Sequence, residues 1–166
     1  DLKYGVKSTG NSRHVAPILF PRTFGSRHLI PWNSGSVFGK EFYKVIPEDQ
    51  EFVVSIVAQL NSTFGILQRE LIGLTNLGEG AIKFCGDDIE LFLILRDLDS
   101  DVLWDPFIRL AERPILDMPD ELVQSDRREL DAIIFDAMGL GLDERTQVYE
   151  ATRLLVKNRT QKAESV

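Results

Sequence analysis

Few side chains in this sequence have the types and spacing that catalysis requires. Its 166 residues include one cysteine, Cys85, and two histidines, His14 and His28. These are too few for a zinc site of thiolate and imidazole ligands, and a single cysteine excludes an internal disulfide. The chain also lacks the H-E-x-x-H pattern of metalloproteases and a Glu-x-Lys pair of the nuclease type. We therefore expect no catalytic residue and no metal site in it.

Two short segments contain groups that bind phosphates or cations in other contexts. Gly78-Glu-Gly80 lacks the third glycine of a dinucleotide-binding turn and precedes a predicted strand, so a strand-entry turn is the better interpretation. The acids of 97–105 lack the regular spacing of calcium ligands, which favours a solvated acidic loop. We predict that the chain is not an enzyme in its own right and holds no cofactor.

The composition is that of a globular protein, with 43% hydrophobic and 27% charged residues. No apolar run approaches the roughly 18 residues that a membrane span needs, and no secretory signal precedes the first predicted strand. We therefore expect a cytoplasmic protein without a membrane partner. Because the sequence begins at Asp1 without a methionine, we expect it to be a piece of a longer protein.

The charge is distributed unevenly along the chain. The net charge of -7 argues against a nucleic-acid partner, but residues 1–46 contain seven Lys or Arg and only two acids. That segment is therefore net +5, and the remaining residues are net -12. A basic segment in an acidic chain indicates an anionic partner such as nucleic acid, although a solvated basic edge explains the same pattern.

Hydrophobic spacing predicts the elements that would position these groups. Residues 15–20, 28–30 and 41–46 have the β-branched and aromatic composition of short strands. A helix is predicted from Pro47 to about Leu60, and a second over 62–72, capped by Asn61 or Ser62. The segment 73–80 is predicted to be a loop, and 81–85 and 89–95 are predicted strands, the second of them buried.

The C-terminal part is predicted to be helical. Residues 97–125 are acidic and are interpreted as a linker, and the apolar spacing of 126–138 predicts a helix that ends at Gly139 and Gly141. Asp143 would cap a last helix, so that 126–166 forms an antiparallel helical hairpin. We expect an α+β fold in which a short-stranded mixed sheet with packed helices occupies residues 1–96.

Three segments together resemble a known family. They are Leu60-Asn-Ser-Thr-Phe-Gly-Ile-Leu-Gln-Arg-Glu-Leu71 with Thr75-Asn-Leu-Gly-Glu-Gly-Ala-Ile-Lys83, the preceding Phe42-Tyr-Lys-Val-Ile46, and the ending from Arg128 to Ala163. In this order they are similar to the C-terminal region of bacterial adenine-specific (N6) DNA methyltransferases of restriction-modification systems. The resemblance covers most of the chain, and it rests on the order of the segments because each motif is loose.

This resemblance implies a target recognition domain, which reads DNA sequence while a separate domain transfers the methyl group. The family's glycine-rich cofactor motif and its Asn- or Asp-Pro-Pro-aromatic motif would lie upstream, since Asp105-Pro-Phe107 is one proline short of the latter. S-adenosylmethionine is therefore implied for the parent enzyme and not for this chain. The implied partners are double-stranded DNA and the catalytic methyltransferase domain.

The cations and amides of the first half are the candidate DNA contacts. Arginine guanidinium groups pair with guanine and asparagine amides with adenine, whereas lysine suits phosphates, and glycine lets a loop backbone approach DNA. On this basis we expect guanine contacts at Arg13, Arg22 and Arg27, an adenine contact at Asn33 or Asn11, and phosphate contacts at Lys3, Lys7, Lys40 and Lys44. His28, Thr75, Asn76 and Lys83 complete the predicted interface, with Gly78 and Gly80 in the same loop.

Two alternatives to DNA recognition remain open at this point. The acidic helical half could instead form a docking module that binds the catalytic domain or another subunit without touching DNA. An enzyme that uses the acidic cluster is a third and weaker hypothesis. Each cation has a plain interpretation as a solvated surface residue, and the same holds for Trp32 and Trp104 as packing residues.

Overall fold

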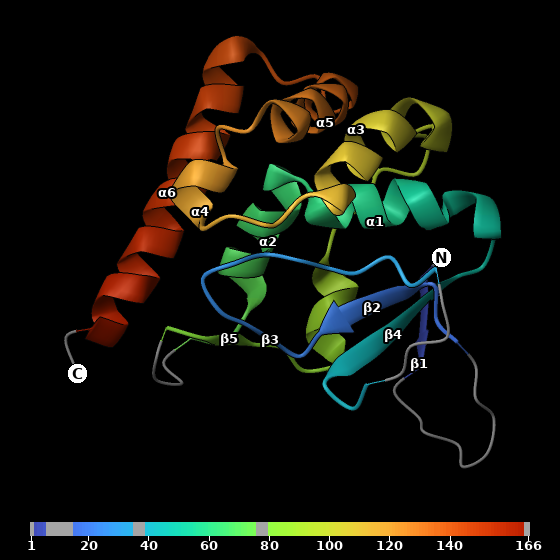
Figure 1. Ribbon diagram of the computed structural model, residues 1–166, viewed down its shortest axis with the longest axis horizontal. Coiled ribbons are helices and arrows are strands. Elements are labelled where there is room, and N and C mark those ends of the chain that lie inside the picture. The colour runs from blue at the N-terminus through green and yellow to red at the C-terminus, as the bar shows by residue number, and fades with distance from the viewer. Residues whose placement is uncertain (1, 6–14, 35–38, 76–79, 165–166) are drawn as a thin grey trace.

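The computed structural model describes residues 2–5, 15–34, 39–75 and 80–164. The chain is α+β, as expected, with short strands on one side of a larger set of helices (Figure 1). In that view the helices fill the upper part of the molecule and the strands lie below them. One end of the long C-terminal helix projects away from both layers.

The strands form two small antiparallel sheets. β1 (Leu2–Gly5), β4 (Phe42–Pro47) and β2 (Ile18–Pro21) pair in the order β1-β4-β2, and β3 (Thr23–Phe24) pairs with β5 (Ile82–Lys83). The expected mixed sheet is therefore wrong for the described strands, because every pairing among them is antiparallel. The predicted strand over 28–30 is also absent; its neighbour Trp32 makes one isolated bridge to Ile18.

Two consecutive helices cover the sheets. Asp49 caps the short 3-10 helix η1 (Gln50–Phe52), which leads into α1 (Val53–Asn61). Ser62 ends α1 and its hydroxyl accepts the N–H of Gly65, so that it caps α2 (Thr63–Ile72) as the sequence predicts. Eight of the nine α1 residues are buried, which places this helix at the centre of the molecule.

The strand predicted over 89–95 does not form. A 3-10 helix, η2 (Asp87–Leu91), occupies its beginning, and an extended segment follows. Two glutamine side chains take the place of a neighbouring strand there: Gln68 exchanges two hydrogen bonds with the backbone of Leu93, and Gln59 does the same with Leu95. The extended segment is thus held by α1 and α2 rather than by a sheet.

The predicted linker over 97–125 is wrong, because most of it is helical. Asp99 caps α3 (Ser100–Glu112), and α4 (Met118–Glu121) follows. The acids of α3 lie on its exposed side, while Leu103, Phe107 and Leu110 are buried against α1 and α5. The acidic composition therefore marks the solvated face of an amphipathic helix.

The last two helices do not form the predicted hairpin. α5 (Ser125–Ala137) ends where Gly139 adopts a left-handed φ of 72°, and α6 (Leu142–Glu164) begins soon after. α5 then packs on α3 and α6 packs along α2, so the two helices diverge (Figure 1). They meet near their connection, where the Phe135 and Tyr149 rings are 5.7 Å apart.

The main hydrophobic core joins the strands to α1, α3 and α5, and a second, smaller cluster of Ile66, Met118, Leu122 and Val156 joins α2, α4 and α6. Phe20, Phe24, Phe84 and Phe92 form a cluster of edge-to-face and tilted ring contacts under the sheets. The same cluster continues into the C-terminal half, through Leu103, Leu110, Leu130 and Ile134 among others. The core therefore extends across the boundary predicted near residue 96.

Candidate functional site

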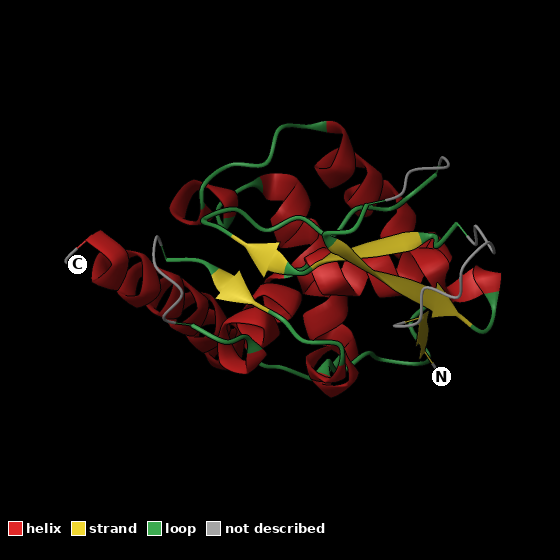
Figure 2. Cartoon of the chain, turned by 90° about the horizontal axis from the view of Figure 1, so that it is seen from below, coloured by secondary structure: helices red, strands yellow, loops and turns green. Residues whose placement is uncertain are grey.

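The face of the sheets turned away from the helices presents several of the predicted DNA contacts. Figure 2 looks onto this side, with the helices behind the strands. Burial alternates along β4, so Tyr43 and Val45 point into the core and Lys44 points away from it. In the second sheet, Thr23 and Lys83 are paired and exposed, whereas the next pair, Phe24 and Ile82, is buried. We use the name strand face for the exposed or half-buried side chains that the strands and their junctions present, namely Arg22, Thr23, Lys44 and Lys83.

Among the cations of the strand face, Arg22 has both backbone hydrogen bonds to the flanks of two strands and a side-chain contact with an aromatic ring. Its backbone N–H donates to Glu41 (2.9 Å), directly before β4, and its carbonyl accepts from Phe84 (2.9 Å), directly after β5. Its guanidinium lies over the Tyr43 ring, with Cζ 4.7 Å from the ring centroid, and the side chain remains exposed. The Tyr43 hydroxyl in turn donates to the Phe84 carbonyl at 3.1 Å. The backbone of Arg22 is therefore fixed by the strands, and the ring contact favours one placement of its guanidinium.

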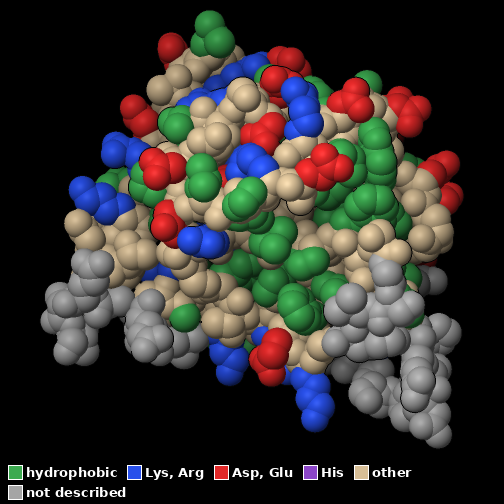
Figure 3. Space-filling model, viewed as in Figure 1, with side chains coloured by type: hydrophobic (Ala, Val, Ile, Leu, Met, Phe, Trp, Pro, Cys, Tyr) green, Lys and Arg blue, Asp and Glu red, His purple; other side chains and the backbone are tan. Residues whose placement is uncertain are grey.

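Charge is segregated between the strands and the helices. The described residues 15–34, 39–47 and 80–86 contain five cations and one acid, namely Arg22, Arg27, Lys40, Lys44 and Lys83 against Glu41. Figure 3 shows basic side chains projecting from the lower edge of the molecule beside an acidic one, and acidic side chains interspersed with basic ones over the helices above. A field of this kind attracts anions to the strand side.

Arg27 and Asn33 each have an identified partner on the protein. Arg27 is exposed, but its Nε lies 3.5 Å from Oδ1 of Asp117, which also accepts from the Ser26 hydroxyl (3.1 Å). The Asn33 amide donates to the Ala16 carbonyl at 2.9 Å, so an adenine contact there would compete with a bond that holds the chain beside β2. Thr75 is exposed at the end of α2.

His28 is removed from the candidate contacts by its burial. The side chain has no exposed surface, and its Nε2 lies 2.8 Å from the Leu60 carbonyl. The ring stacks on Phe24, with centroids 5.3 Å apart. Burial, together with the positive charge of Arg69, lowers the pKa of His28 well below its usual value. A neutral interior histidine cannot touch DNA in this conformation.

Five predicted positions fall outside the described residues: Lys7, Asn11, Arg13, Asn76 and Gly78. The backbone of Lys3 belongs to β1, in register with Ile46 of β4, but its side chain is likewise outside the description. The strand face is therefore defined here by Arg22, Thr23, Lys44 and Lys83 alone.

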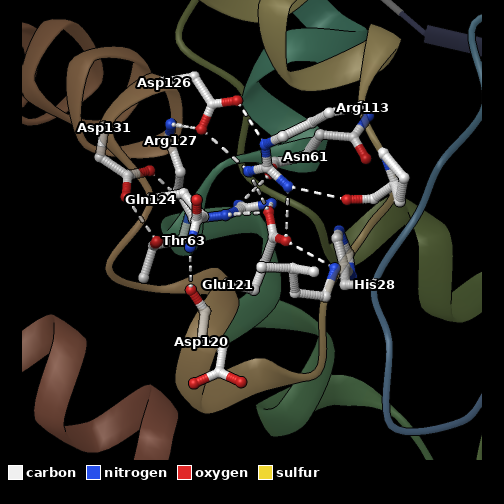
Figure 4. Close-up of polar contacts among 12 residues, drawn as sticks. His28, Asn61, Thr63, Arg113, Asp120, Glu121, Gln124, Asp126, Arg127 and Asp131 are labelled. Atoms are coloured by element: carbon white, nitrogen blue, oxygen red, sulfur yellow. Dashed lines mark hydrogen bonds and ion pairs between the residues drawn. The ribbon is translucent and has the colours of Figure 1, made fainter.

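A buried network of ion pairs, which we did not predict from the sequence, connects four helices (Figure 4). Glu121 of α4 accepts from Arg113 and from Arg127 of α5, each at 2.8 Å, and Arg113 also pairs with Asp126. Arg127 donates in addition to the last carbonyl of α1, that of Asn61, at 2.6 Å. Burial would raise the pKa of Glu121, but the hydrogen bonds from Arg113 and the charge of Arg127 outweigh it and lower the pKa to about 2.

A second polar group lies beside the first. Asp131 accepts from the backbone N–H and the hydroxyl of Thr63 and from the hydroxyl of Tyr149. Burial raises the pKa of Asp131, although all of these partners favour its charged form. Burial and the neighbouring Asp131 raise the pKa of Tyr149. The acceptor oxygens of both networks are occupied by protein donors, which is typical of a structural role rather than of catalysis.

A third group contains two arginines and one carboxylate. Glu70 of α2 accepts from Arg69 beside it in the sequence and from Arg159 of α6 (2.9 Å), and all three residues are buried. Burial lowers the pKa of Arg69 to about 10, against the opposing effect of Glu70. Because two cations face one anion, this group has one uncompensated positive charge on the strand side of α2.

The spacing of the charged residues along α5 could have predicted from the sequence that some of them are buried. Arg127, Leu130, Asp131 and Ile134 lie at i, i+3, i+4 and i+7, so two ionisable residues share the buried stripe of α5 with two aliphatic ones. Charged residues at core positions must be paired. Their partners come from other helices, which no local spacing reveals.

The described residues contain no group of three or more His, Cys, Asp or Glu side chains that could hold a metal ion. Cys85 is exposed and carries a free thiol. Within the same part of the chain, none of the helices combines the length and the apolar character needed to cross a membrane.

Fold and surface together define an α+β protein with a basic strand face and an acidic helical side. Comparisons with protein-family models, with curated proteins and with solved structures found no match to this chain.

Proposed function

We propose that this chain recognises duplex DNA in a sequence-specific way, as the target recognition part of a bacterial adenine-N6 DNA methyltransferase of a restriction-modification system. The observation that carries the proposal is the strand face. Five of the six charged side chains in the described part of 15–47 and 80–86 are cations, within a chain of net charge -7. The ordered resemblance of residues 42–46, 60–83 and 128–163 supports the same function.

The chemistry of the strand face suits this role. The exposed guanidinium of Arg22, which projects from a backbone fixed by the strands, can donate two parallel hydrogen bonds to guanine in the major groove. Lys44 and Lys83 project from strands beside it and suit phosphate oxygens. Methyl transfer from S-adenosylmethionine belongs to the separate catalytic domain in this proposal.

The test is the binding of a fluorescent random-sequence 24-base-pair duplex, measured by anisotropy between 20 and 200 mM salt. We expect affinity that falls steeply with salt, since each neutralised phosphate contributes about 0.9 to the slope of log K against log salt. Replacement of Lys44 and Lys83, the two proposed phosphate contacts, by alanine should lower that slope by about 2. Salt-independent binding, or none at 20 mM salt, would contradict the proposal.

A matched control comes from the exposed face of α6. Arg153 and Lys157 are exposed on α6, so their double alanine variant removes the same charge from another surface. It should retain the wild-type slope. An equal effect of the two double variants would mean that net charge, rather than the strand face, governs binding.

A docking module is the second candidate function, favoured by one surface on the helical side. Trp32 and Trp104 meet edge-to-face at 5.4 Å, and Trp104 keeps 39% of its surface exposed. Ser100 donates to the Glu51 carbonyl (2.7 Å), which brings the exposed acids of 48–51 beside those of 97–105. An exposed tryptophan with acids near it suits a basic partner surface, here that of the catalytic domain.

Co-purification with the catalytic domain tests this second function. Trp104→Ala should abolish capture, whereas Val123→Ala, at an exposed apolar position outside α3, should leave it intact. Capture that is unaffected by Trp104→Ala would eliminate this surface as the docking site.

A further inference from the structure

Arg159 connects the C-terminal helix to two backbone segments that flank the strand face. Its Nη2 donates to the Gly25 carbonyl (3.3 Å), directly after β3, and its Nη1 donates to the Gly80 carbonyl, shortly before β5. Its Nε and Nη2 both bond Glu70 of α2, at 2.9 and 3.0 Å. One guanidinium therefore contacts three parts of the chain that are up to 134 residues away in sequence.

Arg69 strengthens the same attachment from α2. It donates to the Arg27 carbonyl at 3.1 Å and pairs with Glu70, while its Cζ lies 5.3 Å from the centroid of the Phe24 ring. Glu70 thus holds two guanidinium groups, and each of them binds a carbonyl of segment 25–27. The two-stranded β3–β5 sheet has only two residue pairs of its own, and Lys83 also exchanges two backbone hydrogen bonds with Leu74. The bonds from Arg69 and Arg159 add a second attachment, to the segments on either side of this small sheet.

We propose that Arg159 is a positioning residue for DNA recognition: it sets the segments around Gly25 and Gly80 relative to each other, and through them the placement of Thr23 and Lys83. This inference rests on the proposed function of the strand face. It assigns the last helix a role in DNA binding although that helix need not touch DNA.

Position 159 requires the planar guanidinium group of arginine. Three acceptors, two carbonyls and a carboxylate, lie around a single guanidinium, which offers five N–H donors in fixed directions. Lysine retains the positive charge but offers one point donor group, and it cannot span these acceptors. Arg159→Lys therefore separates positioning from long-range electrostatics.

The experiment measures two properties of Arg159→Lys and Arg159→Met, with Arg153→Lys and Arg153→Met on the exposed side of the same helix as controls. The first is amide hydrogen exchange in 22–28 and 80–84. The second is affinity for the random-sequence 24-base-pair duplex at several salt concentrations, below the unfolding temperature of each variant. Should Arg159→Met fail to fold, Arg159→Lys decides the question.

We expect both Arg159 variants to lose exchange protection in the two segments and to bind DNA about tenfold more weakly, because preorganisation is lost. Arg159→Lys should keep the wild-type salt slope, since its charge and the phosphate contacts remain. The Arg153 variants should match the wild type in both measurements.

The failures of the two proposals are distinguishable. Unchanged exchange in Arg159→Lys overturns the positioning role, whatever DNA does. Lost protection with unchanged DNA affinity shows that Arg159 is only structural and also overturns it. A wild-type protein that does not bind the duplex at 20 mM salt overturns the function of the strand face, while the exchange data still decide whether Arg159 fixes the two segments.

Discussion

Asp131 of α5 accepts hydrogen bonds from both the backbone nitrogen (2.7 Å) and the hydroxyl (2.5 Å) of Thr63, the first residue of α2. The two residues are separated by 68 positions in the sequence. A carboxylate at a helix N-terminus satisfies an orphan N–H and interacts favourably with the helix dipole. The start of α2 is therefore held by a helix that follows it much later in the chain.

Replacing Asp131 by asparagine should destabilise the fold by about 1–3 kcal/mol, because one acceptor oxygen becomes a donor facing the hydroxyls of Thr63 and Tyr149. Urea unfolding followed by circular dichroism measures this. Asp136→Asn is the control on the same helix; its partner Arg145 is reached at the surface, so the effect should stay within about 0.5 kcal/mol. Equal effects of the two variants would argue against a special role of Asp131.

Glu121→Gln should be more damaging, by about 3–5 kcal/mol, because it leaves the fully buried Arg127 without its counter-charge. The matched surface pair is Arg109 with Glu129, both about half exposed. Glu129→Gln should cost less than about 1 kcal/mol in the same urea experiment. A small effect of Glu121→Gln would mean that the network relaxes or admits water.

Glu121 should also contribute to the loss of folding stability as the pH falls below 4.5. Its pKa is lowered from an ordinary 4.5 to about 2 in the folded state, so its stabilising contribution is present above pH 4.5 and is lost as pH falls towards 2. Stability measured by urea unfolding from pH 5 to 2 should fall less steeply in Glu121→Gln than in the wild type. Parallel curves would contradict the lowered pKa.

His28 should make the protein less stable in mildly acidic solution. Since its folded pKa lies well below 6.5, the unfolded chain takes up the proton first, and stability falls as pH drops below about 6.5. One such proton contributes a slope of up to about 1.4 kcal/mol per pH unit. His28→Gln should remove this slope between pH 7 and 5, and His14, present in both proteins, cancels in the difference. An unchanged slope would show that His28 does not titrate on unfolding.

Gly73 allows a close approach between the end of α2 and β5. A Cβ there would overlap the buried side chain of Ile82 and lie 2.9 Å from Cζ of Phe84. Gly73→Ala should therefore destabilise the protein by about 1–3 kcal/mol in thermal or urea unfolding. At Gly25 a Cβ meets nothing within 4 Å, so Gly25→Ala should be neutral or slightly stabilising.

Local signals predicted the elements that local chemistry controls. The Ser62 cap, the α2 helix, β4 and the end of α5 at Gly139 all follow from spacing, capping and turn residues, and each is present in the structure. The α+β class follows from the same signals. The acids of 97–112 show how composition misleads, because they lie on the solvated side of a helix whose other side belongs to the core.

Long-range partners account for what sequence reasoning missed. Residues 89–95 have strand composition, but the glutamines of α1 and α2 provide the hydrogen bonds that a neighbouring strand would make. His28 has the residue type of a surface contact, yet the end of α1 covers it. The α5–α6 connection is short, as in a hairpin, but each helix finds its larger apolar partner elsewhere, on α3 and on α2.

For the candidate site, the amino-acid order alone sets the charge asymmetry and the alternation that turns Lys44 outward, because both depend on neighbouring positions in the chain. Three features depend on folding in three dimensions: β3 pairs with β5, the Arg22 backbone bonds to segments of both sheets, and Gly25 and Gly80 bind Arg159. The physical reason is that a buried guanidinium must find acceptors for its donors, and these acceptors come together only when the helices pack.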